Sequence, residues 1–353
     1  MKTYTMIKNI LLTMLFLCSI HTVFSQFDST KTISSLNISG SVDGYYRNAF
    51  KTLKENSNNF TSFTNSNQQF QLGMASAKID YTKGAFFATV DIGFGKRAKE
   101  FSYNDKGILA NIKQAYIAYT VTNRLKISAG KWATHVGYEL LDAPLNRNYS
   151  MSYGFSYGPF FHTGIKADYA INSKSGFMIG IANPTDNINA ISPYKVMLGQ
   201  YNTKLMNDKT LLFINYQGGK TGDQSSFNQW DLVLTNTLND QIAVNYDGTI
   251  FINKIAGNNK IWKSNAFYVN YDPSSKIGLT YRSEFFYDKH AISAGAFATN
   301  IFANTLSVNY KIKQLTLVPE FRLESAKNSL YLNKSGDPTS KSASFLLAAI
   351  YKF

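Results

Sequence analysis

Few residues in this sequence could carry acid–base, metal or nucleophilic chemistry. After the first 25 residues the chain contains only three histidines, His135, His162 and His290, in three separate segments. None belongs to a His-x-x-His or His-Glu-x-x-His pattern. His162 stands beside Thr163, but no serine lies in the Gly-x-Ser-x-Gly turn that presents the nucleophile of a hydrolase. We therefore interpret His162 as a packing residue and predict no enzyme activity, no metal site and no cofactor.

The N-terminus has the organisation of a secretory signal peptide. A basic start precedes the apolar stretch Ile10–Ile20, and Val23-Phe24-Ser25 forms a plausible cleavage site before Gln26. We expect residues 1–25 to be removed and residues 26–353 to be exported as one domain. The only cysteine, Cys18, lies inside the leader, so the exported chain has no disulfide or thiol chemistry.

Composition indicates strands and turns. The whole chain carries a net charge of +14 and is 15% aromatic, and without its leader it keeps about +12. Its basic residues are scattered among Tyr, Asn and Ser rather than clustered, so we expect no nucleic-acid partner. After the leader there is no run of 18 apolar residues, which excludes helical membrane spans. A membrane barrel escapes that test because only every second residue faces lipid.

Two kinds of connection alternate along the chain. Short turns rich in Asn, Asp, Gly and Ser, the chemistry of tight hairpins, occur near residues 82–84, 122–123, 172–175, 206–209, 239–240, 272–275 and 311–313. Longer polar stretches occupy 47–68, 96–106, 136–159, 184–193, 221–228, 252–261, 288–300 and 326–340. Seven turns and eight loops connect sixteen strands, with 14 or 18 as the open alternatives. The predicted fold is an all-β, closed antiparallel transmembrane barrel.

Periodicity within the strands supports burial of one face in lipid. Residues Ile242–Ile250 alternate apolar and polar side chains, as do Leu315–Glu324. A soluble sandwich has the same alternation, but its strands are shorter, about five or six residues. Six strands that enter a short turn also end on tyrosine, the residue favoured at a membrane interface: Tyr81, Tyr119, Tyr169, Tyr271, Tyr310 and Tyr351. An unpaired edge cannot be hydrated in hydrocarbon, so the strand at 36–46 must pair with the strand at 342–353.

One loop is too rich in aromatic residues to be freely solvated. Residues 136–159 would form a loop of about 24 residues, a length that usually indicates function or disorder. Burial of its rings would require the loop to fold inward. We therefore predict that 136–159 enters the lumen and narrows it.

The most distinctive strings of the sequence border this loop and resemble a known family. Gly137-Tyr138-Glu139, Asn146-Arg147-Asn148-Tyr149-Ser150 and Pro159-Phe160-Phe161-His162-Thr163-Gly164 are similar to those of the OmpL-like β-barrel porins of Bacteroidota. The alternating C-terminal strand, which ends on Tyr351 and Phe353, resembles the signal that bacterial barrels present to the barrel-assembly machinery. The resemblance implies an outer-membrane location, lipid contact and pore activity. It implies no catalytic residues.

A porin selects solutes through charged side chains that face its lumen. The candidates for a constriction or selectivity site are His135, Glu139, Asp142, Arg147, Lys126, Arg282, Glu284, Glu320, Arg322 and Glu324. The alternatives are that the three last residues form ordinary ion pairs near a rim and that Arg147 only supports the loop.

We expect a channel for small hydrophilic solutes with a mild anion preference. The competing hypotheses are a structural or adhesive barrel that binds a partner through its long loops and, less favoured, a barrel hydrolase. A homo-oligomer is an open alternative.

Overall fold

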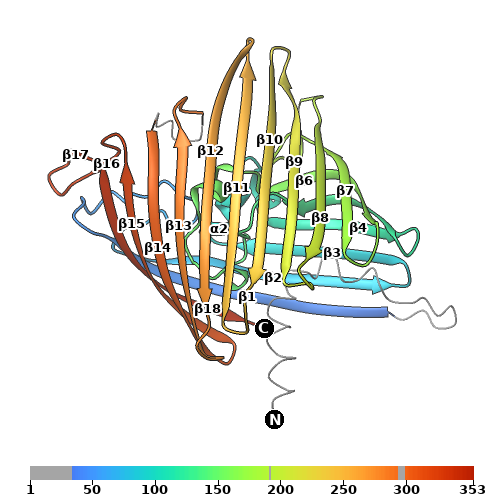
Figure 1. Cartoon of the computed structure of the whole chain (residues 1–353), viewed down its shortest axis with the longest axis horizontal. Coiled ribbons are helices and arrows are strands. Elements are labelled where there is room, and N and C mark those ends of the chain that lie inside the picture. Colours follow the sequence, from blue (N-terminus) through green and yellow to red (C-terminus); the bar gives the residue numbers. More distant parts are fainter. Residues whose placement is uncertain (1–33, 191, 293–298) are drawn as a thin grey trace.

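The chain forms a closed barrel of sixteen antiparallel strands (Figure 1). The computed structural model describes residues 34–190, 192–292 and 299–353, so the expected leader lies outside the described residues. The sixteen-strand prediction is confirmed. Within the described residues, none of the helices has the length and apolar composition needed to cross a membrane.

The barrel strands follow chain order, and a small hairpin lies in the last long loop. The barrel strands are β1 (Ser34–Ala49), β2 (Gln69–Lys83), β3 (Phe86–Phe94), β4 (Ile112–Thr120), β5 (Leu125–Ala133), β6 (Phe161–Ala170), β7 (Ser175–Ala182), β8 (Val196–Leu205), β9 (Thr210–Gly222), β10 (Ser225–Thr237), β11 (Ile242–Ile255), β12 (Asn258–Tyr271), β13 (Ile277–Asp288), β14 (Thr299–Ile312), β15 (Leu315–Ala326) and β18 (Lys341–Lys352). The hairpin is β16 (Tyr331–Leu332) and β17 (Pro338–Thr339), and the short helices are α2 (Lys96–Phe101), α3 (Tyr153–Tyr157) and the 3-10 turns η3 (Gly107–Asn111) and η4 (Ala143–Leu145).

The first and last strands close the barrel, as predicted. Strand β1 pairs with β18 from Ser41 opposite Lys352 to Ala49 opposite Ser344. The backbone N–H of Gly40 donates to the C-terminal Phe353 carbonyl over 3.0 Å. No strand edge is therefore left to face hydrocarbon.

All seven short turns lie where the sequence predicts them. Between β8 and β9, three consecutive residues, Met206, Asn207 and Asp208, have positive φ. Asn and Asp tolerate that left-handed conformation better than most residues, which explains their use in this turn.

Two of the eight predicted long loops are wrong. Between β9 and β10 only residues 223–224 form the connection, and between β11 and β12 only Ala256 and Gly257, both with positive φ. The stretches 221–228 and 252–261 contain few apolar residues at irregular spacing, so the period-two pattern weakens although the strands continue. A strand that rises beyond the lipid has no reason to keep an apolar face.

These extended hairpins make the barrel uneven in height. Strands β3–β8, which we term the low wall, have 8 to 10 residues each. Strands β9–β15, the tall wall, have 12 to 14 residues each (Figure 1).

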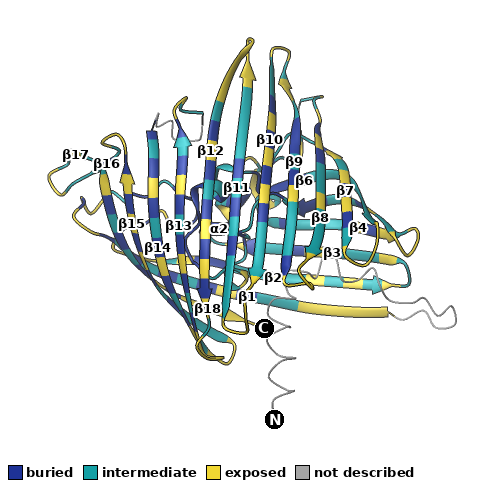
Figure 2. Cartoon of the chain, in the orientation of Figure 1, coloured by how far each residue is buried: buried dark blue, intermediate teal, exposed yellow. Residues whose placement is uncertain are grey.

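Side chains alternate between the two faces of the wall, and the alternation is visible in the bands of burial along each strand (Figure 2). On β11, Asn245, Asp247 and Thr249 are buried and face inward, while Val244 and Tyr246 face outward. Of the predicted tyrosine girdle, five rings are exposed on the outer face: Tyr81, Tyr119, Tyr271, Tyr310 and Tyr351. The period-two prediction is therefore confirmed for these strands.

Candidate functional site

The segment 136–159 leaves the low wall between β5 and β6 and contains both η4 and α3. Most of its aromatic and methionine side chains are buried, with Met151 and Tyr153 at 0% exposure and Tyr149 at 1%, and Tyr138 and Tyr157 are partly buried. Ser152 caps α3 by accepting a hydrogen bond from the Phe155 N–H over 3.1 Å. The segment is thus ordered and packed rather than solvated.

Inward-facing carboxylates of the tall wall accept hydrogen bonds from the backbone of this segment. Asp231 on β10 accepts from the Gly137 N–H over 3.0 Å, and Asp247 on β11 accepts from the Tyr138 N–H over 3.0 Å. A coil segment buried without secondary structure needs such partners for its N–H groups.

Farther along the segment the same arrangement recurs on β13 and β15. Glu284 accepts from the Tyr153 N–H over 2.7 Å, and Glu320 accepts from the Tyr149 N–H over 2.8 Å. Glu320 also accepts from Ser307 on β14 over 2.8 Å. Four strands of the tall wall therefore contact the segment through carboxylates.

A buried ion-pair network joins the segment to the tall wall. Arg282 on β13 lies 2.6 Å from Glu139 of the segment and 3.3 Å from Glu284. Arg322 on β15 lies 2.9 Å from both Glu284 and Glu324. All five side chains have 4% exposure or less. We call Glu139, Arg282, Glu284, Arg322 and Glu324 the anchor network.

Arg282 also binds the backbone of the segment. Its guanidinium donates to the Ser150 carbonyl over 2.7 Å and to the Met151 carbonyl over 3.2 Å. A planar guanidinium group carries five N–H donors and can bind several acceptors at once. The Arg282 side chain therefore fixes the orientation of segment 136–159 relative to β13. In this position Arg282 contacts protein on every side.

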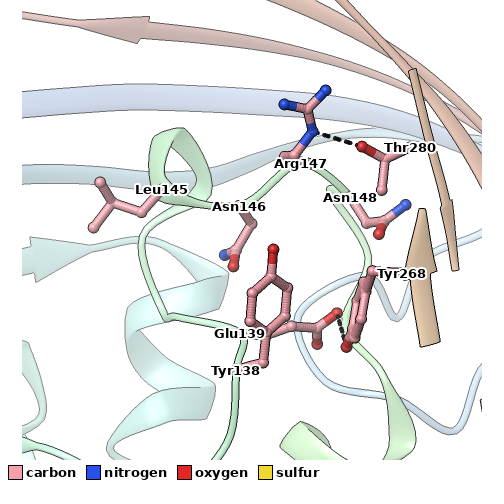
Figure 3. A pocket seen from close by; sticks show the side chains of 8 residues that line it. All are labelled: Tyr138, Glu139, Leu145, Asn146, Arg147, Asn148, Tyr268 and Thr280. Carbon is pink, nitrogen blue, oxygen red and sulfur yellow. Dashed lines mark hydrogen bonds between the residues drawn. The ribbon is translucent and has the colours of Figure 1, made fainter. Parts of the chain in front are cut away.

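Arg147 lies in the part of segment 136–159 that is next to the short turn after β12. Its guanidinium forms two hydrogen bonds with Asp272, of 3.0 and 2.6 Å, and one of 2.7 Å with Thr280 (Figure 3). Asp272 immediately follows β12, at the end of the barrel opposite the long loops. A cavity of about 40 Å³ lies beside Arg147 and Tyr268, large enough for a few water molecules.

The remaining candidates lie on or near the low wall. Asp142 accepts from Lys113 over 2.5 Å, and the same lysine lies 3.0 Å from Asp91. His135 contacts the Tyr216 carbonyl through its Nε2 atom over 3.0 Å. Burial lowers the pKa of His135 to about 4, so the ring is neutral at physiological pH and supplies no charge for selectivity.

Inward-facing ionisable groups remain in contact with solvent on β2, β5 and β6. Lys78 lies 3.0 Å from Asp80, with side-chain exposures of 36% and 19%. Lys166 lies 3.4 Å from Asp168, with exposures of 19% and 31%. Lys126 is half-buried and lies opposite Asp168 in the strand register. We call these three lysines and two aspartates the wet lysine cluster.

Two other long loops close over the segment. Asn58, in the loop after β1, exchanges two hydrogen bonds with the backbone of Leu332, of 2.8 and 3.0 Å. The Tyr157 hydroxyl donates to the Phe60 carbonyl over 2.7 Å. Phe63 packs with Phe155 in a hydrophobic cluster that includes residues of α2. The three loops are thus joined to one another.

The structure brings six of the ten candidate residues together around the segment: Glu139, Arg282, Glu284, Glu320, Arg322 and Glu324. Arg147 lines the same cavity as Glu139 but pairs with Asp272, and Asp142, His135 and Lys126 contact other partners. Sequence reasoning missed Asp231, Asp247 and Lys166. Their inward position in the period-two pattern was the available signal, but a strand's polar face contains many residues, and the pattern gives no contact with the loop.

The architecture is that of an outer-membrane porin. By structure, the chain is similar to the anion-selective porin from Comamonas acidovorans, with a TM-score of 0.62 at 10% identity over 91% of this chain and 100% of that one. It is also similar to the outer membrane channel DcaP of Acinetobacter baumannii, with a TM-score of 0.60 at 11% identity over 94% and 100% of the two chains.

A third structure of the same class is the loop L8 deletion mutant of OmpT from Vibrio cholerae, with a TM-score of 0.60 at 12% identity over 91% and 99%. No curated protein matches the sequence. Residues 35–353 match the family described as "Putative beta-barrel porin-2, OmpL-like", and the chain belongs to that family. Family and fold point to an outer-membrane channel rather than an enzyme.

Proposed function

We propose that the protein is an outer-membrane channel for small hydrophilic solutes, in which segment 136–159 folds into the lumen and constricts it. A sixteen-stranded barrel is wide enough for an aqueous channel, so a constriction must come from an inserted loop. The observation that carries the proposal is the set of hydrogen bonds from the segment's backbone to inward-facing carboxylates on four strands of the tall wall.

The same contacts suggest where solutes pass. The anchor network is buried, so its charges contact protein rather than a moving ion. The wet lysine cluster faces inward and keeps contact with solvent, which favours a passage along β2–β8. Three lysines against two aspartates give this lining a net positive charge, and a low-dielectric wall concentrates its field. We infer a mild anion preference from that excess.

This proposal redistributes the roles of the candidate residues. Lys126 lines the passage, together with Lys78 and Lys166. Arg282, Arg322 and the glutamates hold the constriction in place. Arg147 is positioned by Asp272 at the short-turn end and is 25% exposed, so its charge can act on solutes at that exit.

Planar-bilayer recordings test the two parts separately. Deletion of residues 140–156 should raise single-channel conductance, because it removes the constriction while leaving the wall strands complete. Lys126→Glu combined with Lys166→Glu should shift the reversal potential in a salt gradient toward cation preference. The wild-type preference should weaken from 0.1 to 1 M salt, as the screening length falls from about 10 to about 3 Å.

The constriction and the anion preference can each be contradicted separately. Unchanged conductance after the deletion, with a barrel that still folds, would place the segment outside the passage. An unchanged reversal potential in the double Glu variant would move selectivity to Arg147. If neither wild type nor deletion variant conducts, the channel proposal fails.

A further inference from the structure

Among the described strand residues, every charged side chain on the outer face of the tall wall is basic. Three exposed lysines face outward there: Lys220 on β9, Lys254 on β11 and Lys263 on β12. The carboxylates of these strands and of β10, β13 and β15 face inward and are buried. The turn residue Asp223, next to β9, accepts a hydrogen bond from the Tyr194 hydroxyl.

The strand register places Lys220 and Lys254 side by side near the long-loop end of the wall, whereas Lys263 lies four residues along β12 from Asn259, the partner of Lys254. Lys220 and Lys254 both pair with Ser226, so they flank the same residue of β10. Two strand spacings separate them, a distance of roughly 10 Å. Lys263 lies on the next strand, opposite Tyr287 of β13.

Lys263 borders a groove of about 250 Å³ on this outer face. The apolar part of the groove is formed by Ile261 and by Phe285, whose side chain is 42% exposed. Its polar part consists of Lys263, Asn265, Tyr287 and His290. The His290 Nδ1 lies 3.1 Å from the Ile261 backbone nitrogen and 3.3 Å from the Ile261 carbonyl oxygen, so this ring is positioned by the backbone of β12.

The depth of the groove places it at a membrane interface. Lys263 lies eight residues from Tyr271, which belongs to the aromatic girdle at the short-turn end. With about 3.4 Å per residue and a strand tilt near 40°, the separation along the barrel axis is roughly 20 Å, close to the height of the apolar band of such barrels, about 25 Å. The groove therefore begins in the acyl region and ends at head-group level on the long-loop side.

We propose that this groove binds a phosphorylated glycolipid of the outer leaflet. Lys263 would pair with a phosphate, with Tyr287 as a further donor, while an acyl chain lies over Phe285 on the membrane side of Lys263. Charge complementarity carries the proposal, because anionic head groups fit an outer face whose strand charges are all basic. Lys220 and Lys254 would hold phosphates of adjacent lipid molecules. Long extracellular loops, the usual orientation of such barrels, place the groove in that leaflet.

The test uses the folded full-length barrel in detergent micelles, with purified lipid A as the probe. Native mass spectrometry measures bound lipid, and heat-modifiability on gels measures the unfolding temperature. Lipid A should bind and raise that temperature. Lys263→Ala should weaken binding about fivefold, and removal of all three lysines roughly a hundredfold, the scale for a basic residue near an anionic surface. Lys83→Ala, an exposed outward lysine at the opposite rim, is the matched control and should leave binding unchanged.

Several outcomes would overturn the proposal. If chemically dephosphorylated lipid A binds as tightly as lipid A, the groove makes only an apolar contact with the lipid. If inorganic phosphate raises the unfolding temperature as much as lipid A does, the ligand is a soluble anion. If the Lys263→Ala barrel binds lipid A as tightly as the wild type, Lys263 does not bind the phosphate. If that variant fails to fold, Lys263→Gln replaces it and is judged by the same criterion. Conductance is a separate readout, which none of the lysine substitutions should abolish.

Discussion

Two groups of inward-facing charged residues, the anchor network and the wet lysine cluster, differ in their contact with solvent. On the tall wall, Arg282 and Glu284 have 0% and 1% side-chain exposure, and they form part of a network that includes the segment 136–159. On and beside the low wall, Lys78 and Asp168 keep exposures of 36% and 31%, and each forms an ion pair with a neighbour on its own strand. The same alternation of inward-facing and outward-facing side chains places both groups of residues on the inner face of the barrel.

The difference teaches that an inward position alone does not make a charged residue a selectivity residue. A charge that contacts water acts on passing ions, whereas one surrounded by protein partners mainly orients those partners. In a low-dielectric setting the loss of one partner leaves the other uncompensated. We therefore expect the anchor network to govern stability and the wet lysine cluster to govern selectivity.

The largest effect should follow from breaking the anchor network. Arg282→Met leaves Glu139 and Glu284 without one of their cationic partners and should lower the free energy of unfolding by about 3–5 kcal/mol, the scale for a broken buried pair. Lys166→Met, on the low wall, removes a partly exposed ion pair of the kind worth about 0–1 kcal/mol. Urea titration of the barrel in lipid vesicles measures both. Equal losses would contradict the division between the two groups.

A smaller effect should follow from adding a charge at matched inward positions. Asn245 on β11 is 5% exposed, and its amide donates to the Tyr138 hydroxyl over 2.9 Å. Asn245→Arg must therefore displace the segment, and we expect a loss of about 1–3 kcal/mol from overpacking. Asn202 on β8 faces inward on the low wall and is only half-buried, so Asn202→Arg should be tolerated. Thermal unfolding followed by gel mobility compares the two. A tolerated Asn245→Arg would mean that the segment is easily displaced.

The strand count and facing were predictable because they depend on local signals. Turn residues such as Asn207 and Asp208 specify hairpins by their own backbone preferences. The tyrosines at strand ends, Tyr271 for example, mark an interface by their amphipathic rings. The two missed hairpins, around residues 223–224 and 256–257, lie where the strands extend beyond the lipid, and there the facing signal no longer exists.

The site was predictable in its residues but not in its connections. Glu139 and Arg282 are 143 positions apart in the chain, and no spacing rule links them. Their contact depends on the path of segment 136–159, which is set by many packing interactions at once. For the same reason the sequence could not distinguish a buried Arg282 from a solvent-exposed Lys166. Both occupy the polar face of a strand, and only the position of the loop differs.

The smallest effect on stability should come from the partly exposed ion pair at the short-turn end. Arg147 and Asp272 have exposures of 25% and 37%, so the solvent screens their interaction, and Asp272→Asn should cost less than about 1 kcal/mol. The same substitution weakens the contact that positions Arg147, and open-channel current noise should rise because the end of the segment can then move in the passage. Thr280→Val, which removes a hydrogen bond to Arg147 but keeps its ionic partner, should raise the noise less. A loss of stability as large as that of Arg282→Met would show that the anchor is not confined to the buried network, and that the segment is held along its whole length.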